Sequence, residues 1–244
     1  MRAFIVTFGG WLILAAGGCA TRGPNHVYFT TDASPAVHDL GPPRAALTGI
    51  VAPGERVLGL AYDYNTDHLF VRIAPAQVIR VIERPSGKVL RELPLPPPLQ
   101  TLASADLAVR SSDRHLFAVH PDGRSVVELA ESGAFVRHLE FAGLAETITG
   151  LACDQRQGRL LLLTGGTVRS FAFDGRELGS VPLQGDVSPV SLGYDSDARH
   201  YFVPLADGRT LGEFDAGGSL VARHPVGGAI TAIDAGPRSF VRVF

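Results

Sequence analysis

The sequence lacks the short motifs that mark the commonest catalytic and metal-binding sites. It contains no HExxH, CxxC or CxxCH pattern, which excludes the zinc-protease, dithiol and haem-attachment sites built on those spacings. No serine stands in a GxSxG frame, so a nucleophile elbow is excluded as well. We therefore expect no metal ion and no cofactor, and we assign no catalytic residue.

Charge of either sign is also scarce. Charged residues make up 19% of the 244 residues, and 22 Lys and Arg nearly balance 24 Asp and Glu, for a net charge of −2. Binding to nucleic acid requires a basic patch, so nucleic acid is not an expected partner. Apolar residues reach 45%, and the 28 Gly and 17 Pro are typical of a turn-rich all-β chain with a large core.

The N-terminus carries an apolar run that does not belong to the folded domain. Residues 3–16 follow Arg2 and number 14, too few for a bilayer span of ~20 residues but enough for a signal-peptide core. The run ends in LAAGGC at Cys19, which resembles the lipobox of bacterial lipoprotein signal peptides. This resemblance implies a lipid anchor on Cys19 and, because Ala20 follows where Asp would retain the protein, an outer-membrane location facing the periplasm. The alternative is an ordinary secretory leader with an incidental cysteine.

Only two cysteines are present, Cys19 and Cys153. If Cys19 carries a lipid, Cys153 has no partner and no disulfide can form. Cys153 is then expected to be a small buried residue. The chain divides into a signal peptide (1–18), a lipidated linker (19–25) and one folded domain (26–244).

The domain repeats one unit, seen most clearly at residues 57–96. Four short apolar runs, here called strands a, b, c and d, are expected at 57–62, 68–73, 78–83 and 88–93, because residues alternate with period two between Gly- and Pro-containing turns. A glycine recurs in the c–d turn. Its positions are 41, 87, 133, 175 and 218. Four-stranded units with a period of ~40–50 residues predict a β-propeller, in which sheets stand face to face around a ring.

The count of strands predicts five blades of four antiparallel strands. The closing blade is expected to take strand a from the C-terminal end and strands c and d from the N-terminal end. Its strand b could come from residues 26–31 or from residues 239–244, and the sequence does not decide between them. Six blades would need ~258 residues at this period, so a six-bladed ring would have to contain an incomplete blade.

The pattern GLAYD, HLFV, VIRVIE, PSGK and VLREL resembles NHL-repeat propellers and the related virginiamycin-B-lyase-like group. The resemblance covers nearly the whole mature chain and implies an extracytoplasmic propeller. It is specific for fold rather than for function, because propellers host many activities.

Two recurring sets of polar residues are expected to be structural. Acidic residues follow strand a, and we expect them to cap the a–b turn rather than to bind calcium. They are Asp63, Asp67, Asp154, Asp195 and Asp197. Histidines begin strand b in four repeats, one per blade, where they cannot converge on a metal. They are His26, His68, His115 and His200.

The b–c turns provide the candidate ligand site. In propellers these turns and the d–a links surround one mouth of the central channel, and we expect the polar residues of two of these turns to bind a ligand there. They are His120, Asp122, Arg124, Asp207 and Arg209. Asp-Gly is also a common hairpin turn, which explains part of this pattern without any ligand.

These observations favour a non-enzymatic, lipid-anchored propeller that acts as a binding or scaffold module in the cell envelope. Its partners would be the membrane, through the lipid, and an envelope protein or small-molecule ligand. The alternative is a propeller hydrolase or lyase acting on a small carbohydrate or lactone. Metal-dependent lactonase propellers such as regucalcin hold their metal with Glu, Asp and Asn, and this chain has only Asn25 and Asn65.

Overall fold

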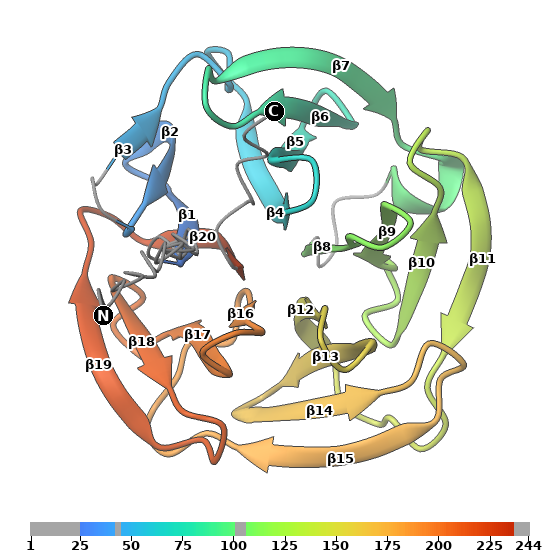
Figure 1. The fold of residues 1–244 in the computed structure, drawn as a ribbon, viewed down its shortest axis with the longest axis vertical. Helices are drawn as coiled ribbons and strands as arrows, with labels where there is room; N and C mark the ends of the chain where they lie inside the picture. Colours follow the sequence, from blue (N-terminus) through green and yellow to red (C-terminus); the bar gives the residue numbers. More distant parts are fainter. Residues whose placement is uncertain (1–24, 42–44, 101–105, 237–244) are drawn as a thin grey trace, which may run out of the picture.

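The computed structural model describes residues 25–41, 45–100 and 106–236. These residues form five four-stranded antiparallel sheets around a central axis, so the predicted all-β, five-bladed propeller is confirmed (Figure 1). Within this part of the chain, no helix is long and apolar enough to cross a membrane.

Each blade places strand a beside the axis and strand d on the outside (Figure 1). Blade 1 contains β4 (Arg56–Asp63), β5 (His68–Ala74), β6 (Val78–Glu83) and β7 (Lys88–Pro94). Blade 2 contains β8 (Leu107–Arg110), β9 (His115–Val119), β10 (Ser125–Leu129) and β11 (Phe135–Glu140). Blade 3 contains β12 (Ile148–Asp154), β13 (Arg159–Thr164), β14 (Thr167–Phe171) and β15 (Glu177–Pro182). Blade 4 contains β16 (Gly193–Asp195), β17 (His200–Pro204), β18 (Thr210–Phe214) and β19 (Leu220–Pro225).

Blade 5 closes the ring with strands from both ends of the chain. From the axis outward it contains β20 (Ile230–Gly236), β1 (His26–Thr31), β2 (Ser34–Asp39) and β3 (Ala45–Leu47). Strand β1 pairs antiparallel with β20, from His26 opposite Gly236 to Thr31 opposite Ile230. Residues 26–31 therefore supply the strand b that the sequence left undecided. Residues 239–244, the other candidate, lie outside the described part of the chain.

The hydrophobic core is divided among the five interfaces between blades. The buried residues form five clusters, each shared by two neighbouring blades. Along β5, Phe70 packs toward blade 2, whereas Leu69 and Val71 pack toward blade 5. Because side chains alternate across a strand, one sheet can serve two interfaces at once. This explains why the strands b of blades 1 to 4 read as nearly continuous apolar runs, such as RLLLLT in β13, instead of alternating with polar residues.

The c–d turns contain the glycines that set the repeat. Gly87, Gly133, Gly175 and Gly218 have φ angles of 69° to 89°, a region that favours glycine. A Cβ atom on Gly175 or Gly218 would also collide with a backbone carbonyl oxygen of the preceding blade. Gly41, the expected fifth member, differs, because its φ is not in this region, although a Cβ atom there would lie 3.0 Å from the Asn25 carbonyl oxygen.

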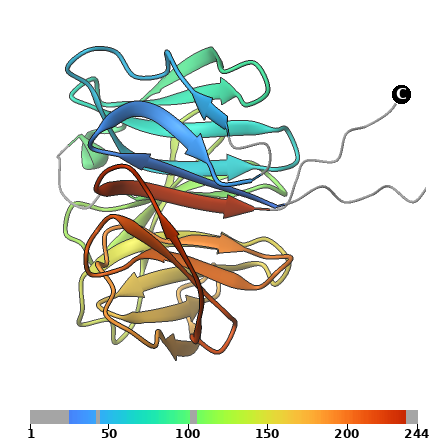
Figure 2. The ribbon, with the colours of Figure 1, turned by 90° about the vertical axis from the view of Figure 1, so that its left-hand side faces the viewer.

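The two faces of the ring are formed by different turns. The b–c turns and d–a links form one face, here called the b–c face, which includes the short 3-10 helix η1 (Pro97–Leu99). The start of β1 and the end of β20 lie on the opposite face, as the side view in Figure 2 shows. On the b–c face, turns and links are joined by backbone hydrogen bonds such as Ile148 N to Gly123 O (2.7 Å) and Ile230 N to Gly208 O (2.8 Å).

Candidate functional site

The five residues predicted as ligand-binding lie on the b–c face but do not form one site. His120, Asp122 and Arg124 belong to the β9–β10 turn of blade 2, whereas Asp207 and Arg209 belong to the β17–β18 turn of blade 4. Blade 3 stands between them. Both turns join the second and third strands from the axis, so they lie partway out along the blades rather than at the centre (Figure 1).

The two aspartates have the same structural role. Asp122 accepts hydrogen bonds from the backbone N–H groups of Arg124 and Ser125 and from the Ser125 hydroxyl, at 2.7 to 3.1 Å. Partial burial opposes the ionisation of Asp122, but these bonds and the nearby His120 outweigh it and lower the pKa of the carboxyl. Asp207 makes the equivalent bonds to Arg209 and Thr210. The turn chemistry expected from Asp-Gly is therefore present in both blades.

Blade 2 adds a residue that the sequence analysis missed, His138 on the outer strand β11. The Ser125 hydroxyl lies 2.7 Å from His138 Nε2 and 2.7 Å from Asp122 Oδ2. The rings of His138 and His120 are 4.7 Å apart. The cluster His120–Asp122–His138 thus gathers two imidazoles and a carboxylate whose ligand atoms lie within 4.8 Å of one another. Two imidazoles and a carboxylate at this spacing could hold a metal ion, which the sequence analysis did not expect.

A second polar centre lies at the axis, where the sequence analysis named no residue. Asp106, just before β8, is buried and accepts hydrogen bonds from Leu151 N (2.8 Å) in blade 3 and Leu192 N (3.1 Å) in blade 4. Ser191 Oγ lies 3.0 Å from its other oxygen and also accepts a bond from Ile233 N of blade 5. One carboxyl group therefore connects blade 2 to blades 3 and 4, and through Ser191 to blade 5.

Burial makes this centre an unusual place for negative charge. Loss of hydration raises the pKa of Asp106 to about 8, although its hydrogen bonds act in the opposite direction. Burial also raises the pKa of Asp234 on β20 well above its usual value, and the nearby Asp106 adds to the shift. Asp234 accepts a bond from Tyr62 N of blade 1 at 2.6 Å. Because both carboxyls are buried and bonded to backbone groups of neighbouring blades, they hold the ring together rather than face a substrate.

Three of the five acids after strand a cap the a–b turns, as predicted, and the other two pair with arginines. Asp63, Asp154 and Asp195 each accept backbone N–H bonds from the turn that follows, for example Asn65 N to Asp63 Oδ1 at 3.0 Å. Asp67 lies at the other end of its turn and pairs with Arg84. Asp197 pairs with Arg156. All of these contacts are internal to the fold.

The strand-b histidines bind carboxylates rather than one another. His115 Nδ1 lies 2.7 Å from Glu128 and His200 Nδ1 lies 2.6 Å from Glu213, and His26 pairs with Asp39. In each pair the acid follows the histidine by thirteen residues, which places it on the adjacent strand c. After His68 the corresponding residue is Val81, which cannot accept a hydrogen bond. The predicted one-per-blade arrangement is confirmed.

Glu128 is the most buried acid of these pairs, and its replacement tests their contribution. Burial alone would raise the pKa of Glu128, but His115, Arg137 and Arg110 offset it and leave the pKa below the usual value. We expect E128Q to lower the free energy of unfolding at pH 7 by about 1.5–3 kcal/mol, the range for charged hydrogen bonds. The stabilisation by ionised Glu128 is fully present above its unfolded-state pKa and is lost as pH falls through its folded-state pKa. The free energy of unfolding of E128Q should therefore depend less on pH below about 4.5 than that of the parent protein.

Urea unfolding between pH 3 and pH 7 measures this effect. E131Q is the matched control, because the Glu131 side chain is 34% exposed and pairs with Arg91 and Arg114 at the surface. Such a pair contributes about 0–1 kcal/mol. Equal losses in E128Q and E131Q would contradict the role assigned to Glu128.

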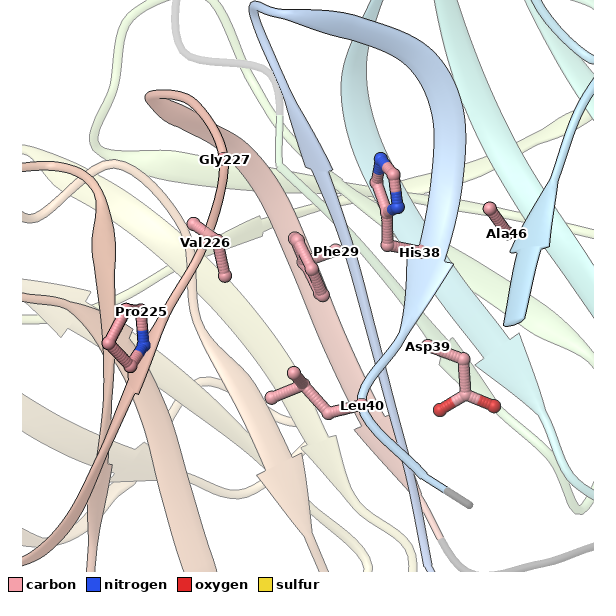
Figure 3. A pocket seen from close by; sticks show the side chains of 8 residues that line it. All are labelled: Phe29, His38, Asp39, Leu40, Ala46, Pro225, Val226 and Gly227. Atoms are coloured by element: carbon pink, nitrogen blue, oxygen red, sulfur yellow. The ribbon is translucent and has the colours of Figure 1, made fainter. Parts of the chain in front are cut away.

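A groove opens between blades 4 and 5 on the outer side of β1. Its volume is about 310 Å³, and Figure 3 shows His38 and Leu40 on one wall and Pro225 and Val226 on the other. Phe29 forms its floor and stacks on the His38 ring at 5.1 Å. This is the lower end of the size range of small-ligand sites, and the lining is mostly apolar.

Comparison with known proteins identifies the fold of this chain but no family and no activity. No protein-family model matches the chain, and no curated protein sequence matches it. Solved structures do match. A chain in the crystal structure of a nidogen/laminin complex superposes with a TM-score of 0.61 at 12% identity, over 87% of this chain and 98% of that one.

A second solved structure extends the comparison to an enzyme. Myxococcus xanthus glutaminyl cyclase superposes with a TM-score of 0.53 at 16% identity, over 72% of this chain and 73% of that one. The fold of this chain is thus similar to that of a protein found in a complex and to that of an enzyme. Because identities are this low, the likeness is one of architecture alone.

Proposed function

We propose that the protein is a lipid-anchored binding module of the bacterial cell envelope, held by Cys19 in the outer membrane and facing the periplasm. The b–c face is the contact surface in this proposal, and an envelope protein or a small polar ligand is the partner. A relationship to NHL-repeat and virginiamycin-B-lyase-like propellers belongs to the same proposal, on the sequence pattern of the repeats.

The observation that carries the proposal is the direction in which the chain leaves the ring. Strand β1 begins at His26 beside Gly236, on the face opposite the b–c turns (Figure 2). Cys19 precedes Asn25 by six residues, a reach of at most about 20 Å when extended. An anchor at Cys19 would therefore keep that face near the membrane and turn the b–c face toward the periplasm.

The b–c face also suits recognition, because its shape is fixed before a partner arrives. Backbone bonds join the turns to the d–a links, including Leu183 N to Gly166 O at 2.8 Å. Arg124, Asp207 and Arg209 are exposed on this rigid surface. Surfaces that are preorganised lose less entropy on binding. Asp106 and Asp234 are buried and bonded to backbone groups of neighbouring blades, so these two acids do not support the hydrolase or lyase alternative.

Anchoring is tested by expressing the full chain in a bacterium with an outer membrane and comparing it with C19S. We expect the parent protein in the outer-membrane fraction with a mass increase from acyl chains on Cys19, and C19S in the soluble periplasmic fraction. A parent protein that is processed but soluble, with Cys19 free, would contradict the anchor.

The contact face is tested in the same cells by placing a photo-cross-linking residue at position 209 on the b–c face or, as a control, at exposed Arg199 in an a–b turn of the same blade. Discrete adducts from position 209 and none from position 199 are expected. Adducts from position 199 alone would place the contact on the wrong face.

A further inference from the structure

Two turns of the b–c face have the same backbone conformation but different side chains. In blade 2 the turn reads His120-Pro-Asp-Gly-Arg-Ser125, and in blade 4 it reads Leu205-Ala-Asp-Gly-Arg-Thr210. Gly123 and Gly208 have φ angles of 69° and 65°. The closing bonds also match, since His120 N to Ser125 O measures 2.9 Å and Leu205 N to Thr210 O measures 2.8 Å.

The differences fall on the two histidines. Leu205 occupies in blade 4 the position of His120, and Arg223 occupies the position of His138, because Gly212 pairs with Arg223 as Val127 pairs with His138. The turn of blade 4 therefore adopts the same backbone conformation, with the same aspartate cap, although it has neither imidazole. In blade 2 the imidazoles do make contacts of their own: His120 Nδ1 lies 3.3 Å from Asp122 N and 3.1 Å from Asp122 Oδ2, and His138 Nε2 lies 2.7 Å from Ser125 Oγ. Blade 4 shows, however, that the turn and its aspartate cap form without either imidazole.

We propose that His120, Asp122 and His138 form a binding site for a divalent transition-metal ion of the Zn²⁺ type. Their ligand atoms already lie within 4.8 Å of one another. In a tetrahedral site with bonds of about 2.0–2.1 Å, the ligands lie about 3.3–3.4 Å apart, so small side-chain rotations complete the geometry. Asp122 and His138 are exposed and His120 is half-buried, so these rotations meet little resistance.

Ser125 contacts two of the three proposed ligands. Its buried hydroxyl contacts both Asp122 Oδ2 and His138 Nε2. When the metal takes His138 Nε2, this hydroxyl can still donate to Asp122, which orients the carboxylate as outer-shell partners do in known sites. Two imidazoles and one carboxylate suit zinc and its neighbours rather than Ca²⁺ or Mg²⁺, which prefer oxygen ligands.

Three protein ligands at the surface leave the fourth position of the metal to water or to a donor from a partner. The proposal holds whether or not Cys19 carries a lipid, and it goes beyond the envelope role by naming a chemistry for this part of the b–c face.

Calorimetric titration of the full chain with ZnCl₂, produced without a polyhistidine tag, tests the site. The matched variant is H120L/H138R, which gives blade 2 the residues of blade 4. We expect the parent protein to bind one Zn²⁺ and the variant to bind it at least about 100-fold more weakly, because loss of outer-shell partners alone costs 10–100-fold. Without zinc, the two proteins should unfold at the same temperature. X-ray absorption of the zinc-loaded parent should show two imidazole ligands.

D122N provides a second variant, because an Asn side chain can still cap the turn. It should fold like the parent and bind zinc more weakly. The proposal is overturned if the parent binds no zinc, or if H120L/H138R binds it with the parent's affinity and stoichiometry.

Discussion

Replacing Asp106 with alanine should lower the free energy of unfolding by about 3–5 kcal/mol, the largest loss expected from any single substitution considered. The change would leave the N–H groups of Leu151 and Leu192 buried without an acceptor, and each such group costs about 1–3 kcal/mol. It would also disconnect Ser191, through which blade 2 is linked to blade 5. Chemical unfolding near pH 4, where folding requires little proton uptake by Asp106, followed by far-UV circular dichroism, measures the loss.

D106N is the informative control for this prediction. Because Leu151 and Leu192 both donate to Asp106 Oδ2, the other oxygen is the one that carries the proton in the neutral acid. An asparagine can place its side-chain oxygen where Asp106 Oδ2 lies, and its NH₂ group where Asp106 Oδ1 lies. From there the NH₂ group can donate a hydrogen bond to Ser191 Oγ. We therefore expect D106N to match the parent protein near and below pH 4, and to be more stable than the parent at pH 7, where the parent must take up a proton on folding. A loss as large in D106N as in D106A would contradict this assignment.

The same residue predicts a pH dependence with a definite sign. The folded-state pKa of about 8 lies above the unfolded value of 3.8, so the folded protein holds the proton more tightly. The stabilisation is complete below pH 3.8 and is lost as pH rises toward 8, at no more than about 1.4 kcal/mol per pH unit for one group. D106N should flatten this slope, and an unchanged slope would refute the role of Asp106.

A disulfide between V27C and A235C, in a C153A background, should stabilise the protein by up to about 5 kcal/mol. These two residues are partners in the β1–β20 ladder and belong to the same buried cluster. Ladder partners in antiparallel sheets have Cα atoms about 4.5 or 5.5 Å apart, within the range a disulfide needs. The bond would close a loop of about 200 residues, for which loss of unfolded-state entropy gives the quoted upper value.

The comparison is between oxidised and reduced forms of the same variant, since both carry the same substitutions. A higher urea midpoint for the oxidised form is expected. Equal midpoints would show that the two strands are not fixed beside each other in the folded state.

The fold could be predicted because its determinants are local and repeated. Gly87, Gly133, Gly175 and Gly218 mark one turn in four blades, and each needs a backbone conformation that glycine adopts readily. The strand b of blade 5 could not be assigned in this way. Residues 26–31 and 239–244 are both apolar and short, and the choice depends on pairing between ends of the chain that no local pattern records.

The candidate site was only half predicted, for a related reason. His120 and Asp122 stand in one turn, whereas His138 follows on the next strand and comes beside them only through the register of the β10–β11 hairpin. Counting outward from Gly133 would have placed His138 near the start of strand c. The turn chemistry of Asp122 and Asp207 was visible, because it depends on neighbours two and three residues away.

Asp106 left a signal that the sequence analysis did not use. The corresponding positions in the other blades are Gly59, Gly150, Ser191 and Thr231, all small or hydroxylated. An aspartate at such a position of the innermost strand is unexpected unless it has dedicated partners. Those partners are backbone groups of blades 3 and 4, which only the closed ring brings within reach.

Strand β1 closes the ring by lying against β20, and peptide mapping of the oxidised V27C/A235C variant measures this pairing. Proteolysis under non-reducing conditions followed by mass spectrometry should find the peptides containing positions 27 and 235 joined within a monomer in nearly all molecules. A second variant, with its cysteine pair at positions 235 and 241, places the partner in the segment 239–244. The pairing of β1 with β20 would be contradicted if positions 235 and 241 joined efficiently in the second variant while positions 27 and 235 stayed free thiols in the first.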